Sequence, residues 1–271
     1  MLRVSDVAFG YVPEQTLFKD VSFTIESGEF LAVGGRNGCG KTTITRLLVG
    51  LETPRTGRIF YNDTDITGWT PAKRSQYIGY VFQQPDRQMF RPTVAQEVAF
   101  GPEQQGYSRA EVKEITAQAL ERVRLSDKAD AYPPLLHRGE KQRVAIASAL
   151  AMQSEILILD EPTSGQDGTE TKELLGLLQS LRKDGLAIVL ITHDMEIIAS
   201  QCSRVLVMGN QTKAFDGSPE ELFTKRDDLE ALGLERPACV SLSMAVPSLG
   251  YCASMEEFTK RMITYKQQGG R

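Results

Sequence analysis

The sequence has no apolar stretch long enough to cross a membrane, and its N-terminus lacks the uninterrupted apolar core of a signal peptide. It also contains few cysteines, four in 271 residues, and only two histidines. The cysteines follow no C-x-x-C spacing, which disfavours a structural zinc site or a redox pair, and we expect them to stay reduced. Basic residues are not in excess: 31 Lys and Arg face 35 Asp and Glu, for a net charge of −4. This balance disfavours a general nucleic-acid binder.

The remaining composition is that of an ordinary globular chain. Hydrophobic residues make up 41% and charged residues 24%, which excludes a disordered tail, a collagen-like fibre and a disulfide scaffold. The length allows one large domain, or one domain with an appendage. Without an export or membrane signal, the sequence predicts a soluble cytoplasmic protein.

Hydrophobic patterning predicts strands that alternate with helices over most of the chain. The expected strands lie in several parts of 2–34 and at 78–82, 156–159, 187–191 and 205–208. The expected helices lie at 41–51, 168–183 and 194–201, with turn-rich strand material at 52–70. This alternation indicates an α/β fold with a mainly parallel sheet that is covered on both faces.

Three capping boxes predict helix starts outside this alternation, at 108–111, 218–221 and 254–257. The first belongs to a long stretch of helical pattern, and the other two belong to the last part of the chain. We therefore expect a main domain at 1–220, a helical subdomain within it at about 93–150, and a small C-terminal appendage at 221–271.

The strongest motif is a glycine-rich loop that fits G-x-x-x-x-G-K-[ST] between a predicted strand and a predicted helix. Its glycines let backbone N–H groups converge on phosphate oxygens, and the helix N-terminus adds a favourable dipole. Lys41 would neutralise the β- and γ-phosphates of a nucleotide, and Thr42 would hold Mg²⁺. The flanking strand and helix disfavour the alternative of a chance glycine-rich turn. The candidate nucleotide-binding residues are Gly35, Arg36, Asn37, Gly38, Cys39, Gly40, Lys41, Thr42 and Thr43.

A pair of carboxylates follows the apolar strand predicted at 156–159. Asp160, at the end of that strand, can reach Mg²⁺ through water, and Glu161 can polarise an attacking water. By itself such a pair often marks only a strand that meets solvent. After a phosphate loop, it predicts a metal-binding Asp160 and a general base Glu161.

With these two sites in place, the sequence resembles the ATP-binding cassette (ABC) ATPases. Further motifs of that family follow in the family's order over about residues 1–220. They are Tyr11 where an aromatic ring stacks on adenine, the glutamine loop at Gln83, the signature at 136–140 (usually L-S-G-G-Q), the dimer-interface loop at 164–167, and the switch histidine His193. Each match is weak alone, but the ordered set is specific. The resemblance implies a P-loop ATPase fold with an antiparallel β subdomain and a helical signature subdomain.

The resemblance also implies a mechanism. In these ATPases two cassettes pack head to tail, and each nucleotide lies between the phosphate loop of one subunit and the signature of the other. Gln83 then senses Mg²⁺ and the membrane partner, Glu161 polarises water, and His193 reaches the γ-phosphate. ATP and Mg²⁺ are the expected cofactors. The signature residues expected at the nucleotide are His137, Gly139 and Glu140.

The signature departs from the family pattern at two positions. His137 replaces a serine that caps the helix and can bond the γ-phosphate, and Arg138 replaces a glycine. Loss of a serine cap costs about 1 kcal/mol, although Glu140 keeps the other half of the capping box. Two interpretations stay open: tolerated variation at a solvent-lined helix start, or impairment of the site that this signature completes. The second favours a heterodimer with a normal partner signature over a homodimer.

Cys39 is the other unusual residue, because it lies inside the phosphate loop. The nearby helix N-terminus should favour its thiolate, and a thiol reagent should then inhibit the ATPase unless nucleotide is bound. The simpler interpretation, which we prefer, is a small residue that fills space in the loop.

A transporter motor fits the sequence better than two other classes. Soluble ABC ATPases that act on DNA or ribosomes usually carry two cassettes or a long coiled-coil arm, and Gln83 and His137 lie too close together for such an arm. The acidic charge balance likewise predicts no nucleic-acid partner. A nucleotide or small-molecule kinase would not need the signature or the loop at 164–167.

Among transporters, the chain resembles the energy-coupling-factor (ECF) type, which includes cobalt and nickel importers. The similar segments are 83–90, 93–103, 138–143, 216–222 and 232–237. A motor of another importer class is the alternative. The resemblance implies a second ATPase subunit, an integral-membrane coupling subunit and a membrane substrate-binding subunit, and it places this chain at the cytoplasmic face of the cell membrane.

Two further expectations follow from the ECF resemblance. The stretch after Gln83 would form the groove that receives the coupling subunit, although its apolar members Met89 and Phe90 could equally be core residues. The C-terminal appendage would help hold the two ATPases together. The transported substrate resides in the membrane subunits and is not encoded in this chain.

Overall fold

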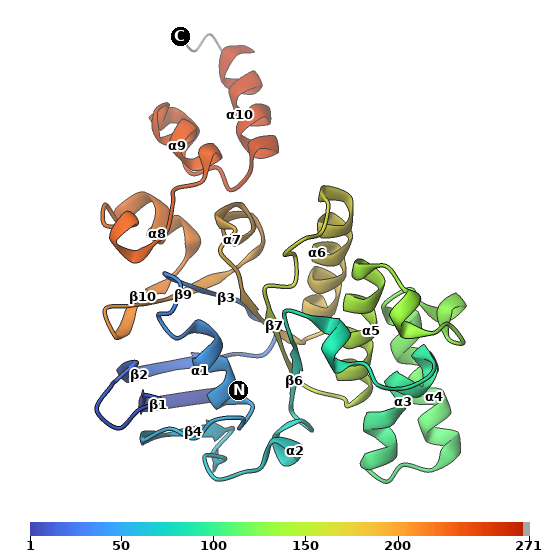
Figure 1. Cartoon of the computed structure of the whole chain (residues 1–271). Coiled ribbons are helices and arrows are strands. Elements are labelled where there is room, and N and C mark those ends of the chain that lie inside the picture. The colour runs from blue at the N-terminus through green and yellow to red at the C-terminus, as the bar shows by residue number, and fades with distance from the viewer. Residues whose placement is uncertain (268–271) are drawn as a thin grey trace.

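The computed structural model describes residues 1–267 and has the α/β architecture expected from the sequence (Figure 1). A six-stranded sheet and a four-stranded sheet form the body, a group of helices lies on one side, and the C-terminal helices extend from the body. Across residues 1–267, none of the helices combines the length and apolar character needed to cross a membrane.

The six-stranded sheet lies at the centre, with the order β10-β9-β3-β8-β7-β6. Its parallel strands are β3 (Phe30–Gly34), β6 (Ile78–Val81), β7 (Ile156–Asp160), β8 (Ala187–Ile191) and β9 (Arg204–Gly209). The edge strand β10 (Thr212–Gly217) pairs antiparallel with β9. Strands β3, β7 and β8 are buried over their whole length, because both faces of the sheet are covered.

Alternate residues of one strand supply two separate cores. In β7, Leu157 and Leu159 pack with α5 (Arg138–Ala151) and α6 (Gly168–Lys183) on one face. Ile156 and Ile158 pack on the other face with α1 (Lys41–Leu48) and the four-stranded sheet. The two-residue period of a strand therefore fixes β7 between two hydrophobic layers.

The four-stranded sheet has the order β2-β1-β4-β5 and is antiparallel, as the ABC resemblance implied. Its strands are β1 (Leu2–Phe9), β2 (Phe18–Ile25), β4 (Thr56–Tyr61) and β5 (Thr64–Asp65). The turn predicted at Asn62-Asp63 joins β4 to β5, with Tyr61 opposite Thr64. Asn62 has φ 48°, the left-handed conformation that such tight hairpin turns require.

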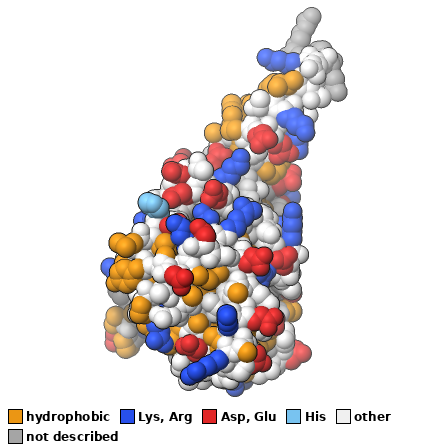
Figure 2. Space-filling model, turned by 90° about the vertical axis from the view of Figure 1, so that its right-hand side faces the viewer, with side chains coloured by type: hydrophobic (Ala, Val, Ile, Leu, Met, Phe, Trp, Pro, Cys, Tyr) orange, Lys and Arg blue, Asp and Glu red, His pale blue; other side chains and the backbone are white. Residues whose placement is uncertain are grey.

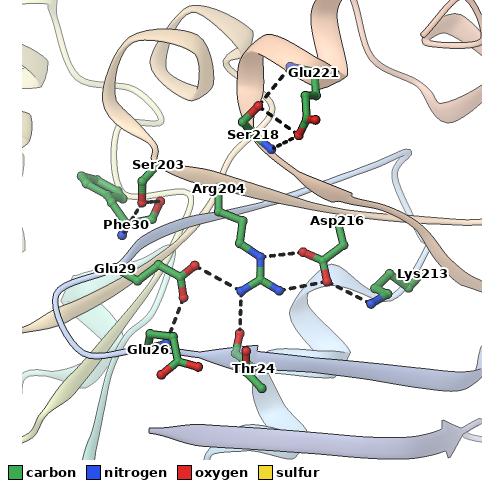
Figure 3. Close-up of polar contacts among 10 residues, drawn as sticks. All are labelled: Thr24, Glu26, Glu29, Phe30, Ser203, Arg204, Lys213, Asp216, Ser218 and Glu221. Atoms are coloured by element: carbon green, nitrogen blue, oxygen red, sulfur yellow. Dashed lines mark hydrogen bonds and ion pairs between the residues drawn. The ribbon is translucent and has the colours of Figure 1, made fainter. Parts of the chain in front are cut away.

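Arg204 of β9 joins the two sheets (Figure 3). Its guanidinium donates to both carboxylate oxygens of Asp216, to Glu29 (3.2 Å) and to the backbone carbonyl of Thr24 in β2 (3.2 Å). Burial raises the pKa of Asp216, but the hydrogen bonds from Arg204 and Lys213 outweigh this and leave the pKa below its usual range. A fully paired, partly buried charge cluster thus ties the central sheet to the antiparallel one.

Helices α3 (Val94–Gln104), α4 (Arg109–Arg122) and α5 pack together in the region predicted to be helical. Thr93 caps α3, and the predicted capping box between Ser108 and Glu111 starts α4. On the face that these helices present, basic and acidic side chains are interspersed (Figure 2). A short helix, α2 (Pro71–Arg74), precedes β6.

The C-terminal part contains α8 (Pro219–Lys225), α9 (Ala238–Met244) and α10 (Met255–Gln267), of which α9 and α10 extend beyond the body (Figure 1). The capping box at 218–221 is present as predicted. The box at 254–257 is only half right: Ser254 accepts from the N–H of Glu257, but the Glu257 carboxylate accepts from Ala253, one residue earlier than expected.

Predicted element ends differ from the structure where backbone conformation intervenes. The first helix ends at Leu48 and not at 51, because Gly50 has φ 77°, outside the helical region. Strand β6 ends at Val81, so Phe82 belongs to the following loop. In contrast, α6 has the predicted bounds, and α7 (Met195–Gln201) begins one residue later than predicted because Asp194 is its N-cap.

Candidate functional site

The glycine-rich loop joins β3 to α1 at the carboxyl end of the central strands, where open α/β sheets bind ligands. Gly35, Gly38 and Gly40 have positive φ values of 131°, 80° and 103°. A Cβ on Gly35 would lie 2.2 Å from the carbonyl oxygen of Met208, and one on Gly40 would lie 2.7 Å from the Phe18 ring. At Gly38 a Cβ would meet open space, so only the positive φ, and not close packing, favours glycine there.

Lys41 is buried at the start of α1. Its Nζ donates to the carbonyl oxygens of Gly35 (2.8 Å) and Arg36 (3.0 Å). An ammonium group has three donors, so one N–H remains for an anion at the loop. Gly40, the N-cap of α1, has no side chain to occupy the first-turn N–H groups, which leaves them available to an anion.

Asp160 lies beside Thr42, which brings together two oxygen donors from β7 and α1. The Tyr80 hydroxyl donates to Oδ2 of Asp160 (3.2 Å), and the Thr42 hydroxyl hydrogen-bonds to the same carboxylate. Burial raises the pKa of Asp160, while these two hydrogen bonds act in the opposite direction. Carboxylate and hydroxyl oxygens are ligands that suit Mg²⁺.

Glu161 follows in the left-handed conformation, with φ 46°, which is uncommon for a residue other than glycine. Its N–H donates to Ile191 (2.9 Å), so the backbone is held against β8 through this turn. Its carboxylate receives two partners: Gln83 Nε2 donates to Oε2 (2.8 Å), and His193 Nδ1 lies 3.3 Å from Oε1. The structure therefore brings two predicted site residues, from two separate segments, to the carboxylate of a third.

A cleft of about 670 Å³ opens beside these groups. It is lined by Thr42, Arg46, Phe82, Gln83, Gln84, Arg87, Gln88 and Asp160. No sequence motif marked Arg46 or Tyr80 as a site residue, and Arg87 was marked only as part of the segment 83–90. A signal existed for Arg46, because it follows Thr42 by four residues and so lies on the same face of the helix; the position of Tyr80 depends on the pairing of β6 with β7.

Tyr11 lies over the start of α1. Its hydroxyl is 3.0 Å from Oγ1 of Thr43, and Phe9 packs edge-on against its ring at 4.9 Å. The side chain is 58% exposed, so part of its ring is open to solvent. This is the arrangement that a stacking residue needs, with one end anchored and an aromatic surface accessible.

The signature segment begins α5 and contacts a different part of the chain. The Glu140 carboxylate accepts from the N–H of His137 (3.0 Å), but the His137 ring makes no capping hydrogen bond within the described residues. The Arg138 guanidinium packs against Gly165, where an added Cβ would lie 2.8 Å from it. Of the described residues that line the cleft beside Asp160, none belongs to the signature.

Of the two interpretations of Cys39, the structure favours the preferred one, a residue that fills space, over a thiolate. Burial raises the pKa of the Cys39 thiol, and the nearby Lys41 ammonium and backbone N–H groups do not compensate. The helix N-terminus is therefore the weaker influence here, and the side chain serves as a half-buried filler between loop residues.

An apolar groove of about 320 Å³ lies on the other side of the loop that carries Gln83. Its lining includes Phe82, Gln88 and Met89 from that loop and Phe100 from α3. Met89 is half-buried against the core, whereas Phe90 is 63% exposed at the edge, packed edge-on against Phe100 at 4.9 Å. Phe90 is therefore a surface residue, and Met89 contributes to both groove and core.

Comparison with known proteins gives consistent matches. The family model described as ABC transporter matches residues 18–164. A Methanosarcina acetivorans protein named as an ABC transporter ATP-binding protein is 40% identical over 86% of this chain, which spans 38% of that relative's length. The energy-coupling factor transporter ATP-binding protein EcfA2 of Symbiobacterium thermophilum is also 40% identical, over 86% of this chain and 82% of its own length.

Among solved structures, CbiO1 from Clostridium perfringens superimposes with a TM-score of 0.77 at 31% identity. The match covers 92% of this chain and 96% of that chain. That protein is described as part of the ABC transporter complex CbiONQ. The similarity thus extends over the C-terminal part as well as the nucleotide-binding core.

Proposed function

Because this chain belongs to the ABC transporter family, we propose that it is the ATP-hydrolysing motor subunit of a micronutrient importer of the ECF type. The observation that carries this proposal is the meeting of Gln83 and His193 at the Glu161 carboxylate, beside a glycine-rich phosphate loop. The likeness to EcfA2 and to CbiO1 over most of both chains supports the ECF type over other importers.

The phosphate loop holds the nucleotide. Residues Gly35 to Gly40 turn backbone N–H groups toward the phosphates, and Lys41 adds a positive charge through its remaining N–H. Thr43 anchors Tyr11, whose exposed ring stacks on the adenine. Arg36, Asn37 and Cys39 lie between the glycines and complete the loop around the phosphates.

The donor set beside the loop fits Mg²⁺. Thr42 and Asp160 would hold the ion, and Gln83, which lines the same cleft, would be the third candidate ligand. A Mg²⁺ ion held there would supply positive charge to offset the negative charge that develops on the phosphate oxygens. Tyr80 orients Asp160 through its hydroxyl.

Glu161 orients the attacking water and accepts its proton, while Gln83 and His193 fix the position of the carboxylate. Glu161 follows β7 with a left-handed backbone, and its carboxylate contacts both partners. His193 is largely exposed, with 70% of its side chain accessible, and it can reach toward a γ-phosphate.

Catalysis requires a second cassette in head-to-tail contact. The signature residues His137, Gly139 and Glu140 lie at the N-terminus of α5, outside the cleft of their own chain, where they can complete the partner's site. The altered signature favours a heterodimer in which the partner supplies a serine at this position.

The apolar groove between β6, α3 and α5 receives the integral-membrane coupling subunit, and a separate membrane protein binds the substrate. This arrangement places the chain at the cytoplasmic face of the membrane. In the C-terminal appendage, Leu242, Met244, Met255 and Ile263 expose apolar side chains, which suits a pairing surface between two ATPases.

The Glu161→Gln variant tests the catalytic assignment. Because the amide keeps the shape but cannot accept a proton, we expect kcat to fall at least about 100-fold while ATP binding is retained. Glu114→Gln, on the exposed face of α4, is the matched control. An unchanged kcat in Glu161→Gln would remove Glu161 from the proposed role.

The Phe90→Ala variant tests the membrane partner. Phe90 is exposed at the groove, so its loss should weaken co-purification of the coupling subunit and leave ATP binding intact. Full retention of the complex on an affinity column would contradict the proposed groove.

A further inference from the structure

The loop that carries Gln83 begins at the end of an edge strand. In the six-stranded sheet, β6 has β7 on one side and the sheet ends on its other side. An edge strand presents backbone N–H and C=O groups that a neighbouring strand would otherwise pair. At the exit of β6, the groups in question are the carbonyl of Tyr80 and the N–H of Phe82.

The side chain of Gln88 pairs with both of these groups. Its Nε2 donates to the carbonyl oxygen of Tyr80 (3.2 Å), and its Oε1 accepts from the N–H of Phe82 (3.2 Å). The carbonyl of one residue and the N–H of the second residue after it point to the same side of a strand. A carboxamide carries a donor and an acceptor on the same side, so Gln88 replaces the N–H and C=O that one residue of a neighbour strand would supply.

These two hydrogen bonds link Gln88, within the loop, to the backbone just before Gln83. Gln83 follows Phe82 directly, and its Nε2 donates to Glu161 at 2.8 Å. The middle of the loop is attached elsewhere, because Asp86 forms an ion pair with Lys141 of α5 at 2.6 Å. The Gln88 side chain thus fixes the start of the loop to the sheet, and its bond to Phe82 lies one residue before Gln83.

We propose that Gln88 is a positioning residue for ATP hydrolysis: its carboxamide completes the hydrogen bonding at the end of β6 and so holds the backbone from which Gln83 reaches Glu161. The inference rests on the proposed roles of Gln83 and Glu161, and it does not depend on the membrane partner. Gln88 lies between the cleft beside Asp160 and the apolar groove, since it lines both.

The test is a double-mutant cycle in the full chain, purified in its assembled ATPase form. Gln88→Met keeps the length of the side chain and removes both hydrogen bonds. We expect kcat to fall roughly tenfold, which corresponds to ~1.4 kcal/mol of barrier, with KM for ATP unchanged because the phosphate loop is not altered. Gln104→Met, at the exposed end of α3, is the matched control.

The second arm repeats Gln88→Met in a Gln83→Ala background. If Gln88 acts through Gln83, its substitution has no further effect on kcat there. An equal loss in both backgrounds, a rise in KM in place of a fall in kcat, or no loss at all would overturn the proposal. If Gln83→Ala alone leaves kcat unchanged, the proposed role of Gln83 fails, and the inference on Gln88 fails with it; if only the Gln88 arm fails, the proposed function is unaffected.

Discussion

The phosphate loop and the signature segment are both helix N-termini, yet they are built in opposite ways. At the start of α1, Lys41 is buried and makes two hydrogen bonds to the loop, and Gly35 and Gly40 have close neighbours that leave no room for a side chain. At the start of α5, His137 and Arg138 are exposed. The first helix start is held by contacts within its own chain, whereas the second leaves these two side chains open to solvent.

This difference predicts where substitutions should be tolerated. A Cβ added at Gly35 would lie 2.2 Å from a backbone carbonyl oxygen, and one added at Gly40 would lie 2.7 Å from the Phe18 ring, so these two positions cannot absorb a larger residue. A change at the exposed His137 or Arg138 meets mainly solvent, so we expect the fold to survive it and only the proposed composite site to be affected. The following variants probe this contrast, beginning with the largest expected effect.

Gly35→Ala and Gly38→Ala compare two glycines of the same loop. Both have positive φ, which costs an alanine on the order of 1 kcal/mol, but only Gly35 would place its Cβ 2.2 Å from a carbonyl oxygen. We expect Gly35→Ala to abolish binding of a fluorescent ATP analogue and lower the melting temperature, and Gly38→Ala to do neither strongly. Equal effects of the two variants would show that conformation, and not packing, governs the loop.

His137→Ser probes the signature. A serine would cap α5 and complete the box with Glu140, so the free energy of unfolding should rise by about 1 kcal/mol. If the altered signature impairs the composite site, the ATPase rate of the purified chain alone should also rise. His137→Ala separates the two effects, because it removes the ring without adding a cap. An ordinary rate in the native chain that His137→Ser leaves unchanged would rule out impairment.

Alkylation of Cys39 gives the smallest effect. The other three cysteines are buried and Cys39 is half-buried, so a small thiol reagent should modify Cys39 first in the native protein. Burial raises the pKa of Cys39, so the thiolate fraction at neutral pH is low and the rate should climb as the pH rises through and above the ordinary thiol range. Bound ATP should slow the reaction, as mass spectrometry can measure; a rate that is fast at neutral pH would contradict the burial effect.

Much of the site could be predicted from local patterns. The phosphate loop, the Asp160-Glu161 pair and the bounds of α6 follow from residue types within a few positions of each other, because turn and capping chemistry is local. The ionisation of Cys39 could not, since it depends on how deeply the loop is covered. The capping box at 254–257 was predicted with the Glu257 carboxylate bonded to the N–H of Ser254, but in the structure it bonds to the N–H of Ala253, one residue earlier.

The sequence by itself determined which groups exist: the glycines, the lysine, the two carboxylates, the glutamine and the histidine, each at the end of a recognisable strand or the start of a helix. Only the tertiary structure decided that Gln83 and His193 meet at Glu161, that Tyr80 supports Asp160, and that Gln88 completes the edge of β6. The physical reason is the strand order β3-β8-β7-β6. Packing of both faces of this sheet sets that order, and pairing between strands far apart in the chain leaves no trace in local periodicity.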